Sequence, residues 1–209
     1  MRPTKTLNRI TVTLFSALLS ILTIQAQEVY RAEGSSITVQ LRSNGLYDIA
    51  LCPNIGVELQ TDYGLAFQLD YTGAWWNNDA KHRYFSNYAF QTELRYYFDK
   101  KRIQPYNGHH VGLYAQMITY DFEFGKKGYM CRNLDDTFAI GASYGYSFVL
   151  NKHWNLDITA GIAYLHSKYD VYNPNSRGTY TREYTKKKSL FIPTKLEATF
   201  VWNINRKNN

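Results

Sequence analysis

The stretch Phe138 to Leu150, FAIGASYGYSFVL, alternates between two kinds of side chain along its whole length. Its even-numbered positions are mostly large and apolar or aromatic, and the odd-numbered positions from Ala139 to Ser147 are small. Successive side chains of a β-strand point to opposite faces of a sheet. This period of two therefore predicts a long strand with one apolar face and one small, mildly polar face, and any fold of the chain must accommodate it.

Seven further stretches show the same alternation, with turn-forming residues between them. They are 37–51, 55–60, 65–75, 88–98, 109–122, 154–166 and 190–204. No stretch after residue 26 has a helical period, so the sequence predicts an all-β fold of eight antiparallel strands. The predicted connections are compact at 61–64, 99–108 and 151–153 and long at 76–87, 123–135 and 167–189; the connection at 52–54 is short. Short turns on one side and long loops on the other are typical of an up-and-down transmembrane β-barrel.

Two features indicate that the apolar face points outward, toward lipid. Aromatic residues lie on this face near the predicted strand ends, as in the girdles of membrane barrels. They are Trp75, Tyr88, Phe98, Trp154, Tyr164 and Trp202. The opposite face is rich in Gly, Ala, Ser and Thr, which fit the narrow interior of an eight-stranded barrel. We expect a barrel with a filled lumen and no open pore. The alternative is a soluble periplasmic, lipocalin-like ligand carrier with inverted faces.

Charged residues on the polar face are expected to pair inside the barrel, because an unpaired buried charge is costly. This lumen polar network would consist of Arg42, Asp48, Glu58, Asp70, Glu93, Arg95, Asp157, Lys195 and Glu197. A polar plug that holds the barrel together is the favoured interpretation, and a path for protons or ions is the alternative.

The first 26 residues predict a secretory signal peptide. Three cations at positions 2, 5 and 9 precede the apolar run 10–24, which is shorter than the roughly 20 residues of a transmembrane helix. Cleavage after Ala26 would leave a flexible segment 27–36, the barrel 37–204 and a polar tail 205–209. Export and an even number of strands would place the barrel in the outer membrane of a Gram-negative cell, with both termini periplasmic.

The two cysteines, Cys52 and Cys131, both fall in connections predicted on the outer side of the barrel. An oxidising compartment permits a disulfide between them, and two free thiols are the open alternative.

Basic residues gather in the last predicted loop. We expect four of them to contact phosphates or acidic sugars of lipopolysaccharide, namely Arg182, Lys186, Lys187 and Lys188. A solvated loop that only keeps the barrel edge polar is the alternative. Nucleic acid is a poor partner, because the compartment is wrong and no basic and aromatic platform stands out.

The sequence contains no recognisable catalytic constellation, cofactor motif or zinc spacing. His109 and His110 are adjacent, so they would point to opposite faces of a strand. His82 and His166 could lie at the barrel rim. Ser86, Ser167 and Asp170 are near them in sequence, at spacings that are not diagnostic. We therefore expect no enzymatic activity, cofactor or metal. A small enzyme acting on lipid or peptide at the rim is the alternative.

Several segments resemble those of a family of uncharacterised, fimbria-associated outer-membrane β-barrels of Gram-negative bacteria. NGLYD at 44–48, CPNIGVE at 52–58 and YGY at 144–146, followed by NKHWNL at 151–156, are similar to its N-L-L-Y-D, T-P-N-x-G-x-E and Y-G-Y segments and its K-x-W-N-L-E turn. PTK at 193–195 is similar to the end of its G-P-T-K segment. Cys52 and Ile192 depart from the family's Thr and Gly. The resemblance implies a barrel of unknown activity. Outer-membrane lipid, lipopolysaccharide and a surface-appendage or envelope protein would be its partners, and we expect a monomer.

Overall fold

The computed structural model describes residues 37–61, 63–78, 83–98, 105–124, 129–133, 137–174 and 180–204. These residues contain one short helix and nine strands. In chain order the elements are β1 (Thr38–Asn44), α2 (Gly45–Ile49), β2 (Asn54–Gln60), β3 (Leu65–Asn78), β4 (Arg83–Tyr97), β5 (Gly108–Phe124), β6 (Tyr129–Asn133), β7 (Phe138–Val149), β8 (Trp154–Pro174) and β9 (Tyr180–Asn203). The predicted signal peptide 1–26, the segment 27–36 and the tail 205–209 lie outside the described residues.

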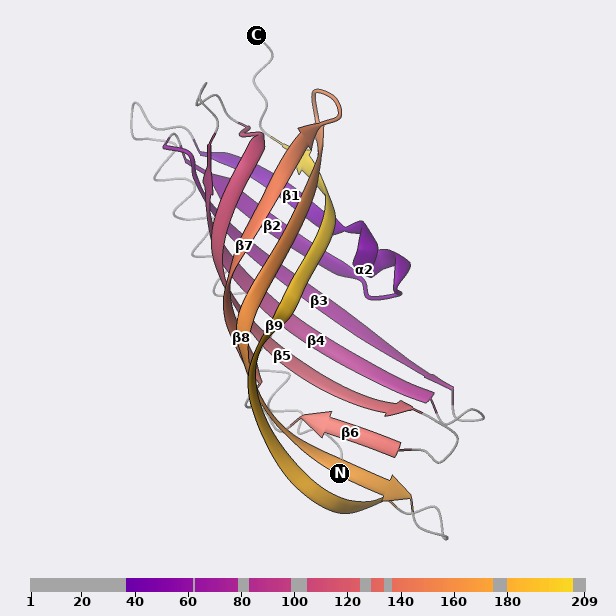
Figure 1. The fold of residues 1–209 in the computed structure, drawn as a ribbon. Coiled ribbons are helices and arrows are strands. Elements are labelled where there is room, and N and C mark those ends of the chain that lie inside the picture. Colours follow the sequence, from indigo (N-terminus) through magenta and orange to yellow (C-terminus); the bar gives the residue numbers. More distant parts are fainter. Residues whose placement is uncertain are drawn as a thin grey trace. The chain divides into compact units, whose positions relative to one another are not determined.

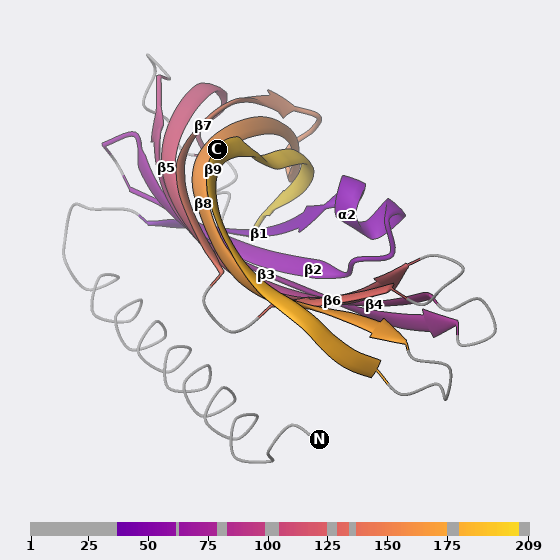
Figure 2. The ribbon, with the colours of Figure 1, turned by 60° about the horizontal axis from the view of Figure 1, so that its bottom comes forward.

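The strands form a closed antiparallel ring in up-and-down order (Figures 1 and 2). The ring closes where Gln40–Asn44 of β1 pair with Asn203–Thr199 of β9. β6 and β7 both lie between β5 and β8. β7 pairs with one part of each of these strands. β6 pairs with 121–124 of β5 and 169–172 of β8, beyond the first residue of β7, Phe138. The predicted all-β, antiparallel barrel fold is confirmed.

The predicted strand 37–51 is wrong in its second half. β1 ends at Asn44, and residues 45–49 form the helix α2. The Asn44 side chain accepts a hydrogen bond from the backbone N–H of Leu46 at 3.1 Å, which is the standard way for Asn to begin a helix. The prediction that the chain after residue 26 contains no helix is therefore also wrong, and the alternation of 45–51 is a coincidence of composition.

The predicted long loops are largely strand. β3 continues to Asn78, β4 begins at Arg83, β8 continues to Pro174 and β9 begins at Tyr180. The predicted loop 123–135 contains β6, so the structure has nine strands where the sequence predicted eight. These segments are polar, but each of them has a neighbouring strand that supplies backbone partners. Such pairing outweighs weak intrinsic strand preference.

Burial is inverted relative to a soluble protein. The large apolar side chains of β7, such as Ile140, Tyr144 and Phe148, are exposed, whereas Ser143 and Ser147 on its other face are buried. The six predicted girdle residues, Trp75, Tyr88, Phe98, Trp154, Tyr164 and Trp202, are all exposed. The apolar face therefore points out of the barrel, and the polar face points into it. The alternative of a soluble ligand carrier, whose apolar face would point into the barrel, is therefore wrong.

The interior is crowded enough to require glycine in places. A Cβ at Gly141 would collide with the carbonyl oxygen of Ile162 on the neighbouring strand. A Cβ at Gly145 would lie 2.6 Å from the imidazole of His110. The small residues of β7 thus make room for the neighbouring backbone and for a large polar side chain.

Candidate functional site in the barrel interior

Two arginines lie in the interior among carboxylates from three strands. Arg95 Nη1 donates to Asp157 Oδ2 at 2.6 Å and lies 3.4 Å from Glu58 Oε2. Arg95 Nε is 3.1 Å from Glu93 Oε2. Arg42 donates to Glu58 and lies 3.4 Å from Asp157 Oδ2. All five side chains are at most 1% exposed, so β1, β2, β4 and β8 are joined through ion pairs that water does not reach.

A lysine extends the cluster toward β9. Lys195 Nζ donates to Glu93, and it lies 3.4 Å from Glu197 Oε2. The amide of Gln91 donates to Glu197 Oε1 at 3.2 Å and to Asp70 Oδ2 at 3.3 Å. Charged and amide side chains of β3, β4 and β9 are therefore part of the same interior network.

Two aromatic groups complete the hydrogen bonds of the innermost carboxylates. The Tyr97 hydroxyl donates to Glu58 Oε1 at 2.8 Å, and His110 Nε2 is 3.1 Å from Asp157 Oδ1. The tyrosine and imidazole rings lie 5.0 Å apart. Both side chains belong to the inward face of their strands, and His110 occupies the space that Gly145 leaves open.

Carboxylates outnumber cations in this network. The cations are Arg42, Arg95 and Lys195, and the carboxylates are Glu58, Asp70, Glu93, Asp157 and Glu197. Each of the five carboxylates has at least one of these cations within 4.0 Å, which offsets the cost of burying its charge. The geometry suits cross-linking of the wall better than chemistry on a substrate, since every charged group faces an opposite charge.

The structure brings eight of the nine predicted network residues together, and Asp48 is the exception. Asp48 lies in α2, is exposed, and accepts hydrogen bonds from Ser43 and Asn54. The prediction failed because it placed Asp48 on a strand that ends at Asn44. His110 was not among the predicted network residues. The sequence predicted that His109 and His110 point to opposite faces of a strand, but their adjacency alone does not tell which of the two faces inward.

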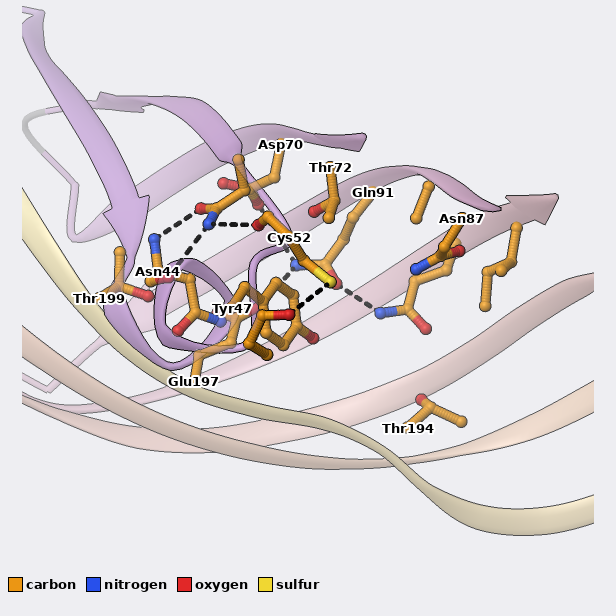
Figure 3. A pocket seen from close by; sticks show the side chains of 15 residues that line it. Asn44, Tyr47, Cys52, Asp70, Thr72, Asn87, Gln91, Thr194, Glu197 and Thr199 are labelled. Atoms are coloured by element: carbon orange, nitrogen blue, oxygen red, sulfur yellow. Dashed lines mark hydrogen bonds between the residues drawn. The ribbon is translucent and has the colours of Figure 1, made fainter. Parts of the chain in front are cut away.

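A pocket of about 360 Å³ lies beside the network. It is lined by Asn44, Tyr47, Ala50, Cys52, Asn54, Asp70, Thr72, Asn87, Ala89, Gln91, Gln116, Ile118, Thr194, Glu197 and Thr199. Figure 3 shows Asp70 and Thr72 on one side of it and Thr194 on another, with Tyr47 and Cys52 of the β1–β2 connection also in view. Asp70, Gln91 and Glu197 belong to both the network and the pocket wall.

The predicted lipopolysaccharide-binding residues lie on a strand, not in the predicted loop. Arg182, Lys186, Lys187 and Lys188 are all exposed on β9. Arg182 is 3.7 Å from Asp170, and the Lys186 ammonium lies 4.6 Å from the centre of the Tyr184 ring. Neighbouring residues of a strand point to opposite faces, so Lys187 faces away from its two neighbours.

Cys52 and Cys131 are free thiols in the structure. Cys52 lies in the connection between α2 and β2, and Cys131 is buried on β6. Burial and the Asp121 carboxylate raise the pKa of the Cys131 thiol to about 11. This thiol is therefore protonated at neutral pH and is a poor nucleophile.

The rim residues considered for catalysis do not form a triad. His166 Nδ1 is 2.7 Å from the Ser189 hydroxyl. Ser167 points to the other face, where it bonds with Tyr120 and Thr137. Asp170 is paired with Thr185 and Arg182. Ser86 is buried on β4, and His82 lies outside the described residues. Within the described ranges no cluster of His, Cys, Asp or Glu could hold a metal ion.

The fold and its interior define a class of protein: an antiparallel β-barrel with an apolar exterior and a cross-linked polar interior. The chain belongs to the family described as "Protein of unknown function (DUF3575)", which matches residues 12–204. It is similar to the crystal structure of Neisserial surface protein A (NspA), with 19% sequence identity, a TM-score of 0.42, and coverage of 82% of this chain and 100% of that chain. No curated protein matches it. In the part of the chain that the structure describes, no helix is long and apolar enough to cross a membrane.

Proposed function

We propose that this protein is a monomeric transmembrane β-barrel of a Gram-negative outer membrane, with a structural or interaction role through its extracellular side. The inverted burial supports this most strongly, because lipid is the solvent that wets an apolar exterior around a polar interior. On β8 the exposed apolar positions run from Trp154 to Tyr164. This length matches the roughly 9–11 residues of a tilted membrane-spanning strand.

Two further features belong to the proposal. β6 and β7 are two parts of one interrupted strand, so the ring has eight positions and both termini are periplasmic. An eight-stranded barrel is just wide enough for side chains to fill it. The ion pairs of Arg42 and Arg95 span the lumen, which makes an open pore unfavourable. In this arrangement the long, charged ends of β8 and β9 face the extracellular side.

Membrane fractionation combined with surface proteolysis tests the location. The protein should sediment with the outer membrane, and trypsin added to intact cells should cleave near Arg182 and Lys186–Lys188, which are exposed. Lys152, in the β7–β8 connection, should be cleaved only after the outer membrane is opened. A soluble protein, or equal cleavage at Lys152 in intact cells, would exclude the proposed location and topology.

Lipopolysaccharide is the partner favoured by the basic residues of β9. Replacing Lys186, Lys187 and Lys188 with glutamine should weaken lipopolysaccharide binding at least about tenfold at low salt, because each basic residue near an anionic surface contributes about 1 kcal/mol. Titration calorimetry of the purified barrel in detergent, repeated at high salt, measures this. Lys152→Gln at the opposite end of the barrel is the control. If the triple variant binds like the wild type, these lysines only keep the strand ends polar.

A further inference from the structure

Among the described strands, backbone pairing in the barrel wall is interrupted between β3 and β9, which leaves a lateral gap. Pairing of β1 with β9 ends at Asn44 and Thr199, and pairing of β2 with β3 ends at Asn54 and Thr72. Beyond these points, the register pairs 73–78 of β3 only with β4, and 180–198 of β9 only with β8, among the residues that the structure describes. Figure 1 shows β1 and β2 ending at α2 while β3, β4, β8 and β9 continue.

α2 and the residues after it close only the near end of this gap. The Asn44 side chain accepts from the Ala198 N–H at 3.3 Å, and the Pro53 carbonyl accepts from the Gly73 N–H at 3.0 Å. Large apolar side chains of this connection are exposed: Leu46 by 40%, Ile49 by 83% and Leu51 by 71%. An exposed apolar segment at the level of the lipid-facing residues is suited to contact with hydrocarbon rather than water.

The interior pocket lies beside the near end of the same gap. Its lining includes Thr72 and Thr199, where the pairing ends, and Thr194 of the free edge of β9. Two lining atoms are buried and have no hydrogen-bond partner within the described residues: Gln116 Oε1, on a residue 7% exposed, and Thr199 Oγ1, on a residue 3% exposed.

Two further atoms that line the pocket, Asn44 Nδ2 and Asn87 Oδ1, are also buried and have no hydrogen-bond partner within the described residues. Buried polar atoms are nearly always paired in native proteins, so these atoms indicate a missing polar partner. The volume of about 360 Å³ lies at the lower end of the roughly 300–1,000 Å³ of small-molecule sites.

We propose that this pocket binds the headgroup of an uncharged amphiphile that carries hydroxyl groups, with the acyl chain leaving through the gap into the membrane. Hydroxyl groups both donate and accept, as the unpaired Gln116, Asn87 and Asn44 atoms require. The carboxylates of Asp70 and Glu197 in the wall disfavour a phosphate. The proposal rests on the membrane location proposed above, because the chain needs hydrocarbon outside the gap.

A protein strand is a poorer occupant of the gap. Pro193 lies in the free edge of β9 and cannot donate a backbone hydrogen bond. The register of β9 also shifts beside Thr194, where Gly161 pairs with Lys195 and Ile162 with Pro193. A proline and a bulge blunt an edge against the addition of another strand.

Binding of 1-monooleoylglycerol to the purified full barrel in detergent tests this inference. Native mass spectrometry should detect one saturable molecule per barrel. Asn87→Leu and Gln116→Leu should each weaken binding about tenfold, because each removes the acceptor that a headgroup hydroxyl would reach. Asn155→Leu is the matched control, since Asn155 is also a buried amide with an unpaired oxygen but lies outside the pocket. Ala89→Trp, which fills the pocket, should abolish binding.

Three outcomes would overturn the inference: no saturable binding, equal weakening by Asn155→Leu, or equally tight binding of free glycerol or of a lysophosphatidate. Circular dichroism and the unheated gel mobility of each variant establish that it is folded, and Ala89→Trp provides a second test if a Leu variant fails to fold. Outer-membrane fractionation is independent of this result. A barrel found in the outer membrane that binds no monooleoylglycerol would contradict only the amphiphile site, and not the proposed location.

Discussion

Replacing Arg95 with methionine should lower the free energy of unfolding by about 3–5 kcal/mol, the usual effect of removing one partner from a buried ion pair. The Arg95 side chain is fully buried, and its guanidinium lies within 3.4 Å of carboxylate oxygens of Glu58, Glu93 and Asp157. Without Arg95, the buried carboxylates of Glu58, Glu93 and Asp157, which come from three strands, would lose a cation that they share. Methionine is unbranched and close to arginine in volume, so the effect would report mainly the lost charge and hydrogen bonds rather than a cavity.

Urea unfolding of the barrel in detergent measures this change. Arg182→Met is the control, because Arg182 is 63% exposed and its contact with Asp170 is 3.7 Å. The Arg182 cation is screened by water, and the buried Asp170 carboxylate keeps its hydrogen bond from Thr185, so this variant should lose at most about 1 kcal/mol. Arg95→Lys should fall between the two, since it keeps the charge but loses the planar fork of donors. Equal stability of Arg95→Met and Arg182→Met would show that the interior network does not hold the wall together.

The faces of the strands could be predicted from the sequence because side-chain orientation in a strand depends only on parity. The alternation of Phe138 to Leu150 predicted which side chains lie inside, and the same parity placed Arg42, Glu58 and Arg95 together in the lumen. The contacts among these residues could not be predicted. They depend on how strands far apart in the chain are brought together, such as β1 with β9 by pairing and β4 with β8 across the lumen.

The departures from strand geometry were also hidden in the sequence. Residues 45–49 have side chains that alternate as well as those of a strand, and the hydrogen bond from Leu46 to the Asn44 side chain turns them into a helix. This local event shortens β1, moves Asp48 out of the lumen, and leaves the free edges of β3 and β9 that frame the pocket. The gap exists because β1 ends at Asn44 and β2 begins at Asn54. The residue at which a strand begins or ends is what side-chain alternation predicts least well.

Arginine in place of Ile158 should destabilise the barrel in lipid bilayers by about 2–4 kcal/mol, the effect of a cation on the lipid face near the bilayer midplane. Ile158 is 46% exposed and lies between the girdle residues Trp154 and Tyr164 on the outward face of β8. In water the same substitution at an exposed strand position would change stability by no more than about 0.5 kcal/mol. The variant therefore distinguishes a lipid-facing exterior from one that faces solvent.

Leu150→Arg is the matched control for depth. Leu150 is 53% exposed and follows β7 at the end of the barrel, where the proposed membrane meets water. There a cation should cost about 0–1 kcal/mol, because the effect falls steeply toward the interface and the long side chain can reach water. Unfolding by guanidinium from lipid vesicles should show a large difference between Ile158→Arg and Leu150→Arg. Two equally small effects would mean that the apolar exterior is not immersed in hydrocarbon. The lateral gap would then open to solvent, and the case for an acyl chain passing through it would fail with the membrane location.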